Sequence, residues 1–343
     1  MNLPIIKGML RTSLSGATVA WLSFICLSQS GCAGSGAGIV IYDYSTGENA
    51  GKIPMESFRE MIRTEANPVG NFFTMTRESD QLVIRKRNSA GTEITKRSMP
   101  LVESVWHSPG WCALDDDGER LAYYDEDTKR LKLRNLKSGA VSNLPAPPIK
   151  SIVAMMLFDW VGSDTLVLLR ELPDAGYSTE ISRINIRDGT IRTYPIEISE
   201  WSHLSPNEKW ILGRNRNSEE RITVYHSSSF AQKTVISSPG PGFKIQSTLW
   251  GADSKWLYYS IWSVNDDKRM IYRQNLETKI QEELPLPTQK GFLLRGSLGQ
   301  TIVASAAGNT WILDLNTRKW RSIGSSNGSV HGIRGTTRYA VTQ

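Results

Sequence analysis

Asn135-Leu136-Lys137-Ser138-Gly139 ends a short apolar stretch, and a phrase of the same kind ends four other stretches along the chain. Each copy of this turn phrase has Asp or Asn first, one large apolar residue second, a variable third position and then a turn. The other copies span residues 43–47, 185–189, 275–279 and 314–318. Self-similarity at intervals of roughly 40 to 50 residues is typical of propellers and other repeat arrays.

A second recurring block precedes the turn phrase. Its fullest copy, residues 201–213, holds Trp201, then the turn Ser205-Pro206-Asn207-Glu208-Lys209, then an apolar stretch. Related copies span residues 77–84, 114–124, 160–169, 250–260 and 296–304. A polar turn followed by a short run of β-branched, aromatic or Leu residues is typical of two strands joined tightly. Together, the two blocks predict four antiparallel strands per repeat, which is one propeller blade.

The number of blades follows from the two ends of the chain. Six complete repeats fill residues 54–100, 101–147, 148–196, 197–240, 241–287 and 288–324. Residues 39–53 resemble the third and fourth strands of a blade, and residues 329–343 resemble the first and second. We therefore predict an all-β, seven-bladed β-propeller of four-stranded antiparallel blades, closed by pairing of the N- and C-terminal strands. Only residues 55–63 leave room for a helical turn or two.

The order Trp, Ser-Pro-Asn-Glu-Lys, apolar strand, Asn/Asp-Leu-x-Thr-Gly resembles the WD40-like PD40 repeat of TolB and of prolyl oligopeptidase propellers. The resemblance covers most of residues 39–343. It implies a propeller and says little about function, because the matching residues are turn and packing residues. We expect no peptidase arrangement, since no α/β domain follows the repeats and no Ser lies in a G-x-S-x-G setting.

The first 31 residues resemble a secretory signal. They contain no Asp or Glu, carry Lys7 and Arg11, and then run apolar for the 12 residues 16–27. An α-helix needs about 20 residues to cross a bilayer, so we expect a cleaved signal rather than a permanent anchor. The following stretch, Ser28-Gln29-Ser30-Gly31-Cys32, resembles the lipobox of bacterial lipoproteins, with Gln29 in place of the usual Leu.

In that interpretation Cys32 carries the acyl chains, palmitate among them. Residues 32–38 then form a flexible Gly/Ser tether to a single propeller domain at residues 39–343. Ala33 resembles lipoproteins sorted to the outer membrane, if the host is Gram-negative. The alternative is an ordinary signal peptidase site, which Ser30-Gly31-Cys32 would also serve. With Cys32 acylated, Cys112 is the only thiol of the mature chain, so we expect no intramolecular disulfide.

The charge balance predicts a mixed, mildly basic surface. The formal net charge of +6 falls to +4 once Lys7 and Arg11 leave with the signal. Basic residues gather at positions 85–87 and 96–97, where they can meet anionic lipid, peptidoglycan or an acidic partner. Two solvated hairpin strands would give the same pattern. We expect no nucleic-acid partner.

Four histidines are available to a site, and none lies within four residues of another. No H-E-x-x-H, C-x-x-C or H-x-E spacing is present, so the sequence predicts no metal and no cofactor. His107 and His203 closely follow Trp106 and Trp201, and the repeats can bring both to one end of a central channel. The alternative is that they cap equivalent turns.

Residues 115–119, Asp-Asp-Asp-Gly-Glu, superficially resemble a calcium loop. They lack its alternating spacing, and they fall on a turn where Asp and Gly are needed for backbone geometry alone.

Tryptophans divide into two groups. Trp106, Trp160, Trp201 and Trp250 recur at one repeat position, where they form either an aromatic ring for a sugar or peptide or the packing between blades. The others, which we expect at an exposed contact surface, are Trp111, Trp262 and Trp311.

The sequence thus predicts an exported, lipid-anchored propeller that binds an envelope protein or a glycan as a recognition or assembly module. Loops at one end of the ring would make the contact while acyl chains hold the ring at the membrane. A propeller enzyme of the lyase, lactonase or cyclotransferase type is the alternative, and it would need three or more His, Asp or Glu converging on the axis. The partner and the oligomeric state stay open.

Overall fold

The computed structural model describes residues 38–46, 48–54, 61–63, 70–103, 105, 112–145, 155–172, 178–195, 204–214, 220–287, 291–306, 308–325, 330–333, 336 and 338–342. All of them belong to one compact unit, Gly36–Gln343. The predictions made for the signal and for Cys32, His107 and His203 lie outside the described residues. In the part of the chain that is described, no helix has the length and hydropathy needed to cross a bilayer.

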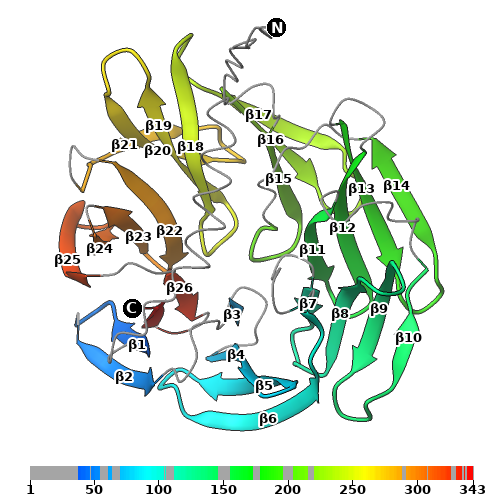
Figure 1. The fold of residues 1–343 in the computed structure, drawn as a ribbon. Coiled ribbons are helices and arrows are strands. Elements are labelled where there is room, and N and C mark those ends of the chain that lie inside the picture. The colour runs from blue at the N-terminus through cyan, green and yellow to red at the C-terminus, as the bar shows by residue number, and fades with distance from the viewer. Residues whose placement is uncertain are drawn as a thin grey trace, which may run out of the picture. The chain divides into compact units, whose positions relative to one another are not determined.

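The described residues form 27 strands in seven antiparallel sheets that follow one another around a ring (Figure 1). Each sheet is one blade, with its first strand innermost. Blade 1 consists of β3 (Met61–Arg63), β4 (Asn71–Glu78), β5 (Gln81–Asn88) and β6 (Glu93–Pro100). Blade 2 consists of β7 (Cys112–Leu114), β8 (Arg120–Asp125), β9 (Arg130–Asn135) and β10 (Val141–Asn143). Blade 3 consists of β11 (Met155–Val161), β12 (Thr165–Leu172), β13 (Ser178–Asn185) and β14 (Ile191–Pro195).

The remaining blades complete the ring. Blade 4 consists of β15 (Trp210–Arg214), β16 (Arg221–His226) and β17 (Gln232–Ser237). Blade 5 consists of β18 (Phe243–Trp250), β19 (Trp256–Ser263), β20 (Arg269–Asn275) and β21 (Gln281–Leu284). Blade 6 consists of β22 (Phe292–Leu298), β23 (Thr301–Ala306), β24 (Asn309–Asp314) and β25 (Lys319–Ser325). Blade 7 combines the two ends of the chain: β26 (Val330–Ile333), β27 (Arg338–Thr342), β1 (Gly38–Asp43) and β2 (Asn49–Pro54).

Blade 7 confirms the predicted closure. Its strand order is β2-β1-β27-β26, and β1 pairs antiparallel with β27, placing Val40 opposite Val341 and Ile41 opposite Ala340. These four side chains are at most 3% exposed. The pairing therefore buries both terminal strands and leaves neither with a free inner edge.

The ring has no single core. Seven clusters of buried side chains are present, one in each seam between neighbouring blades. The seam between blades 1 and 2, for example, joins Phe73 and Leu82 to Leu121 and Tyr123. Each sheet thus buries both of its faces, which requires apolar residues on both sides of the inner strands.

The recurring Trp position serves these seams. Trp160 is 3% exposed and Trp250 is 5% exposed, and each lies in the cluster between its blade and the preceding one. Trp160 also donates a 3.1 Å hydrogen bond from Nε1 to the carbonyl of Ala113 in blade 2. The packing interpretation is confirmed for these two residues, while Trp106 and Trp201 are outside the described residues.

The turn phrase joins the third strand of a blade to the fourth. In blade 5, Asn275 Oδ1 accepts hydrogen bonds from the backbone N–H of Glu277 (2.9 Å) and Thr278 (3.0 Å). The fifth residue, Lys279, adopts a left-handed φ of 63° and donates its N–H to the Asn275 carbonyl. A short Asx side chain is needed at the first position because it caps the turn locally.

Two predictions about single segments are corrected by the structure. Residues 77–84 form the turn between the second and third strands of blade 1, not between the first and second. Residues 61–63 are a strand rather than part of a helical turn, because they pair with β4. In blade 4, the predicted first strand lies largely outside the described residues, and an isolated bridge from Leu204 to Ile211 is found where it would pair.

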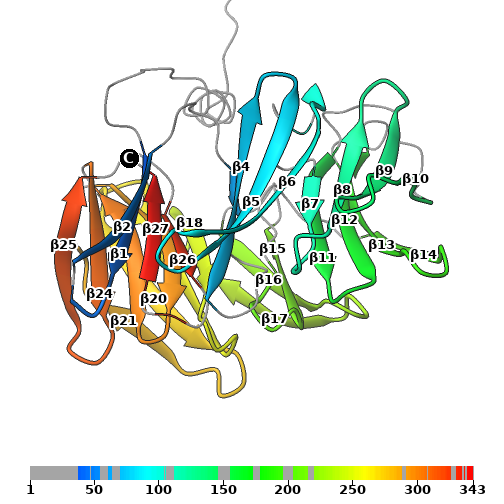
Figure 2. The same ribbon diagram turned by 90° about the horizontal axis from the view of Figure 1, so that it is seen from below.

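Because strands alternate in direction, the ring has two distinct sides (Figure 2). The AB side carries the turns from first to second and from third to fourth strand. The BC side carries the turns from second to third strand and the connections between blades. The N-terminal end of β1 and the C-terminal end of β27 both lie on the BC side, because these strands occupy the third and second places of blade 7.

Candidate functional site

The side chain of Asp115, the first residue of the acidic stretch, is used in hydrogen bonds within its own turn. It is 5% exposed, and Oδ1 accepts the backbone N–H of Glu119 (2.8 Å) and Arg120 (2.9 Å). Oδ2 accepts Arg120 Nε at 2.7 Å. The turn interpretation is confirmed for this residue. Within the described ranges, no group of three or more His, Cys, Asp or Glu is placed to hold a metal ion.

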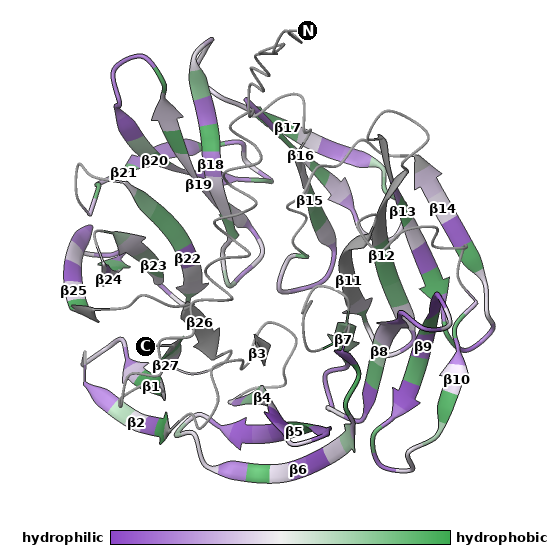
Figure 3. Cartoon of the chain, viewed as in Figure 1, coloured by the Kyte–Doolittle hydropathy of each residue, from purple (hydrophilic) through white to green (hydrophobic). Residues whose placement is uncertain are grey.

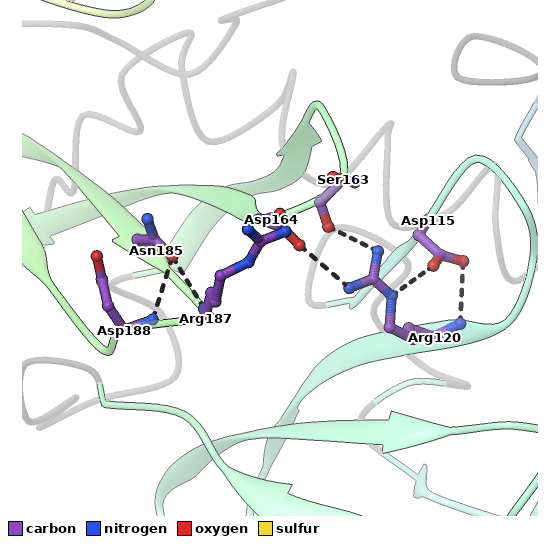
Figure 4. Close-up of polar contacts among 7 residues, drawn as sticks. All are labelled: Asp115, Arg120, Ser163, Asp164, Asn185, Arg187 and Asp188. Atoms are coloured by element: carbon purple, nitrogen blue, oxygen red, sulfur yellow. Dashed lines mark hydrogen bonds and ion pairs between the residues drawn. The ribbon is translucent and has the colours of Figure 1, made fainter.

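The Arg120 side chain extends from that turn and contacts blade 3 (Figure 4). Its Nη2 donates to the Ser163 carbonyl at 2.6 Å, and its guanidinium lies 4.7 Å above the Trp160 ring. Asp164 Oδ1 is 3.9 Å from Arg120 Nη1, and Asp164 Oδ2 accepts Arg187 Nη2 at 2.6 Å. This charged network ties two neighbouring blades together on the AB side.

The AB side carries such links around the ring. Each of the following joins two neighbouring blades: Gly162 N to Glu208 Oε2, Asn207 N to Ser254 Oγ, Ser297 Oγ to the Trp250 carbonyl, Thr301 Oγ1 with Tyr339 Oη, and Arg338 Nη1 to the Ser89 carbonyl. Many of its turns are therefore used in holding the blades together.

Two of the clustered basic residues of blade 1, Arg85 and Lys96, form ion pairs. Arg85 pairs with Glu78 and, at 3.1 Å, with Glu93, and Lys96 pairs with Glu78 at 3.2 Å. The hydrogen bond from Arg85 holds the pKa of the Glu78 carboxyl below its ordinary value, against a smaller opposing effect of desolvation. β5 pairs with β6, and both are mostly hydrophilic in Figure 3. The hairpin interpretation is confirmed.

A different constellation lies on the BC side of blade 5. We call it the Trp262 cluster, consisting of Gln246, Trp262, Asp267 and Arg269. Trp262 Nε1 donates to Asp267 Oδ1 at 2.8 Å, and Arg269 Nη1 donates to Gln246 Oε1 at 2.8 Å. The Arg269 guanidinium lies 5.7 Å from the centre of the Trp262 ring. An indole, a guanidinium, an amide and a carboxylate are thus held together.

Local backbone geometry builds this cluster. Trp262 and Arg269 are direct partners across β19 and β20, so their side chains share one sheet face. Gln246 occupies a β-bulge in β18, and Asp267 holds a left-handed φ of 52° in the hairpin turn. At the neighbouring Asp266, hydrogen bonds, first from the Ser263 side chain and then from the Lys268 backbone, lower the pKa of the carboxyl. Bulges and strained turn residues are common where a side chain must be aimed.

Arg269 keeps unused hydrogen-bonding capacity. Its side chain is 15% exposed, yet its contact with Asp267 Oδ1 is 3.5 Å long, and Nε is buried with no partner among the described residues. Arg273, four residues further along β20 on the same face, lies 4.5 Å from the Trp256 ring and is bonded twice to Glu282, at 2.6 and 2.9 Å. A buried, incompletely paired guanidinium is costly unless a ligand completes it.

Sequence reasoning reached this site only in part. Trp262 was expected at a contact surface and is half-buried at the edge of the cluster. Trp311 is also half-buried but packs in the seam between blades 5 and 6, so the expectation of exposure is wrong for it. Trp111, His107 and His203 lie outside the described residues. Arg269, Asp267 and Gln246 were missed, although the hairpin signal at 263–268 would have placed Arg269 opposite Trp262.

No family model matches the sequence, and no curated protein matches it. Solved structures do match. Hydrazine synthase from Kuenenia stuttgartiensis has a TM-score of 0.54 at 9% identity, covering 84% of this chain and 94% of that chain. The β-propeller domain of Cps50 (Swd1) from Myceliophteria thermophila has a TM-score of 0.53 at 10% identity, covering 89% and 91%. The likeness is one of fold.

TolB propellers are among the structural neighbours too. TolB from Acinetobacter baumannii has a TM-score of 0.46 at 14% identity, covering 80% of this chain and 64% of that chain. The β-propeller part of the sequence resemblance is confirmed by the seven blades of the structure itself. A likeness at this level carries no argument about function.

Proposed function

We propose that this protein is an exported, lipid-anchored recognition module of the bacterial cell envelope, which binds an envelope protein or glycan through the BC side of its ring. The single observation that carries the proposal is Arg269, a mostly buried guanidinium whose Nε has no partner in the described part of the chain. Beside it lie an indole and the Asp267 carboxylate, whose side chain is 76% exposed. Aromatic and Arg side chains of this kind dominate binding energies at protein interfaces.

The ligand would complete the cluster from solvent. Asp267 offers an exposed acceptor, Arg269 offers a donor fork, and the Trp262 ring offers an apolar surface. This combination suits a partner that presents hydroxyl, amide or carboxylate groups beside an apolar face. The Trp262 cluster lies at the turn from β19 to β20, which places the proposed contact on the BC side.

Binding to an envelope fraction tests the proposal, with a matched pair of variants. Arg269→Lys keeps the charge but loses the donor fork, so we expect saturable binding to weaken roughly tenfold or more. Arg273→Lys makes the same change where Glu282 already pairs the side chain, and it should bind as the wild type does. Protease treatment of the fraction then separates a protein partner from a glycan.

The anchor is tested by Cys32→Ala. We expect the variant to leave the membrane fraction and to lose metabolic labelling by palmitate, whereas unchanged partitioning would remove lipidation from the proposal. The enzyme alternative has its own test. Stoichiometric metal in the purified protein, lost in His107→Ala and His203→Ala, would overturn a purely recognising role.

A further inference from the structure

Arg295 lies on the innermost strand of blade 6, one blade further around the ring than the Trp262 cluster. It occupies a bulge in β22, between Leu294 and Gly296, as Gln246 does in β18. A bulge leaves its extra residue outside the ladder and re-aims that side chain. The inner strands of blades 5 and 6 therefore each use a β-bulge to present a polar side chain.

The guanidinium of Arg295 is held by one end only. Its Nε donates to Ser305 Oγ at 2.8 Å, while Nη1 and Nη2 have no partner among the described residues. The side chain is exposed to solvent, yet enough protein surrounds it that desolvation lowers the pKa of the guanidinium, with no neighbouring charge contributing. The donor fork is thus oriented, partly desolvated and without a counter-ion in the described part of the chain.

A second unsatisfied group lies on the same sheet face. Ser305 pairs directly with Leu293 on one side and Thr310 on the other, so the three side chains form one row. Thr310 is 1% exposed, and its Oγ1 is buried with no hydrogen-bond partner in the described residues. Leu293 is 41% exposed. A buried hydroxyl without a partner is costly, so this face of the blade lacks part of its polar pairing among the described residues.

The sequence around the site contains almost no carboxylate to neutralise Arg295. From Leu284 to the last residue there are seven Lys and Arg but a single acid, Asp314. Asp314 caps an AB-side turn, accepting the N–H of Asn316 at 2.8 Å and of Thr317 at 3.3 Å. In the N-terminal half of blade 7, Asp43 and Glu48 also lie at an AB-side turn. Among the described residues of blades 6 and 7, no carboxylate is thus paired with Arg295.

We propose that Arg295 and Ser305 form a second site, which binds the carboxylate of a ligand at the inner end of blade 6. One guanidinium with two free Nη groups matches the two oxygens and single charge of one carboxylate. Ser305 acts as the positioning residue, and the exposed Leu293 contacts the apolar part of the ligand. The row faces blade 7, since Val303 and Ile312 of the same face pack with Tyr339. The site is thus separate from the Trp262 cluster, which faces blade 6.

Acetate is the simplest probe of this site. The Nε–Hε signal of Arg295 in the NMR spectrum of the full chain is identified by its loss in Arg295→Lys. We expect a saturable shift of this signal on addition of sodium acetate, and none with sodium chloride at the same ionic strength. Ser305→Ala, which only frees Nε, should weaken the apparent affinity several-fold without removing it.

Controls keep the result specific. Arg321→Lys, a change at another Arg of blade 6, and Arg269→Lys, a change in the Trp262 cluster, should leave the acetate response unchanged. An equal response to phosphate would overturn the assignment to a carboxylate. No saturable response, or one abolished by Arg269→Lys, would overturn the site itself.

Discussion

Gly118 shows how closely a single turn residue packs against the next blade. It adopts a left-handed φ of 72°, and a Cβ at this position would lie 2.3 Å from the Phe73 ring of blade 1. Gly118→Ala must therefore displace a buried ring as well as accept backbone strain. We expect a loss of about 3 kcal/mol or more in the free energy of unfolding, measured by urea denaturation.

Gly139 is the matched control for Gly118. Its φ is 76°, but a Cβ would meet nothing nearer than Arg134 Nη2 at 4.0 Å. Gly139→Ala should cost about 1 kcal/mol, from strain alone. Equal losses in the two variants would contradict the tight contact between Gly118 and Phe73.

Tyr258 is a buried residue that makes the free energy of unfolding depend on pH. Burial raises its pKa from 10.0 to about 12, with Arg273 acting weakly in the other direction. Because the folded-state pKa is the higher one, the stabilisation is complete below pH 10 and is lost as the pH rises from 10 towards 12. Between these values the wild type should lose roughly 2 to 3 kcal/mol more than Tyr258→Phe. If wild type and Tyr258→Phe lose the same free energy of unfolding between pH 10 and 12 in urea denaturation, the raised pKa of Tyr258 is contradicted.

At the scale of elements, β27 completes the ring. Ala340 is fully buried and pairs with Ile41 on one side and His331 on the other. Ala340→Pro should cost on the order of 3 kcal/mol, since it removes a ladder hydrogen bond and leaves a buried group unpaired. The control is Ser142→Pro on β10, an exposed outermost strand, where we expect a cost below about 1 kcal/mol. Thermal unfolding measures both, and similar costs would argue against closure by β27.

Strands were predictable from the sequence where a turn phrase marked them. Blades 1 and 4 show the limit of that signal. In blade 4 the equivalent turn begins with His226, whose Nδ1 lies 2.7 Å from Ser228 Oγ, and in blade 1 a shorter turn begins with Asn88. In both turns the first side chain caps the turn locally, but neither turn has the residue pattern of the turn phrase. The assignment of residues 77–84 was wrong for this reason, because blade 1 lacked a marker to set its register.

The candidate site was less predictable than the fold. Arg269 reaches Gln246 across β19, a contact that depends on the register of three strands and on a bulge. Bulges shift register by one residue and have no reliable sequence signal. Arg295 was missed for the same reason.

At the scale of the whole molecule, both ends of the described chain and the Trp262 cluster lie on the BC side of the ring. If Cys32 carries acyl chains, the residues from Cys32 to Gly38 reach at most about 20 Å. The proposed anchor would then hold the BC side close to the membrane, and its partner would be bound there.

If recognition belongs to the BC side, a bulky label on each side of the ring in turn will distinguish the two sides. Lys268→Cys places a thiol in the BC-side turn of blade 5, and Lys137→Cys places one in the AB-side turn of blade 2; both positions are exposed. Cys112 is 1% exposed, which protects it from a bulky maleimide. We predict that labelling at position 268 abolishes saturable binding to the envelope fraction, while labelling at position 137 changes it less than about twofold. Binding that survives the label at 268 and is lost with the label at 137 would contradict the account.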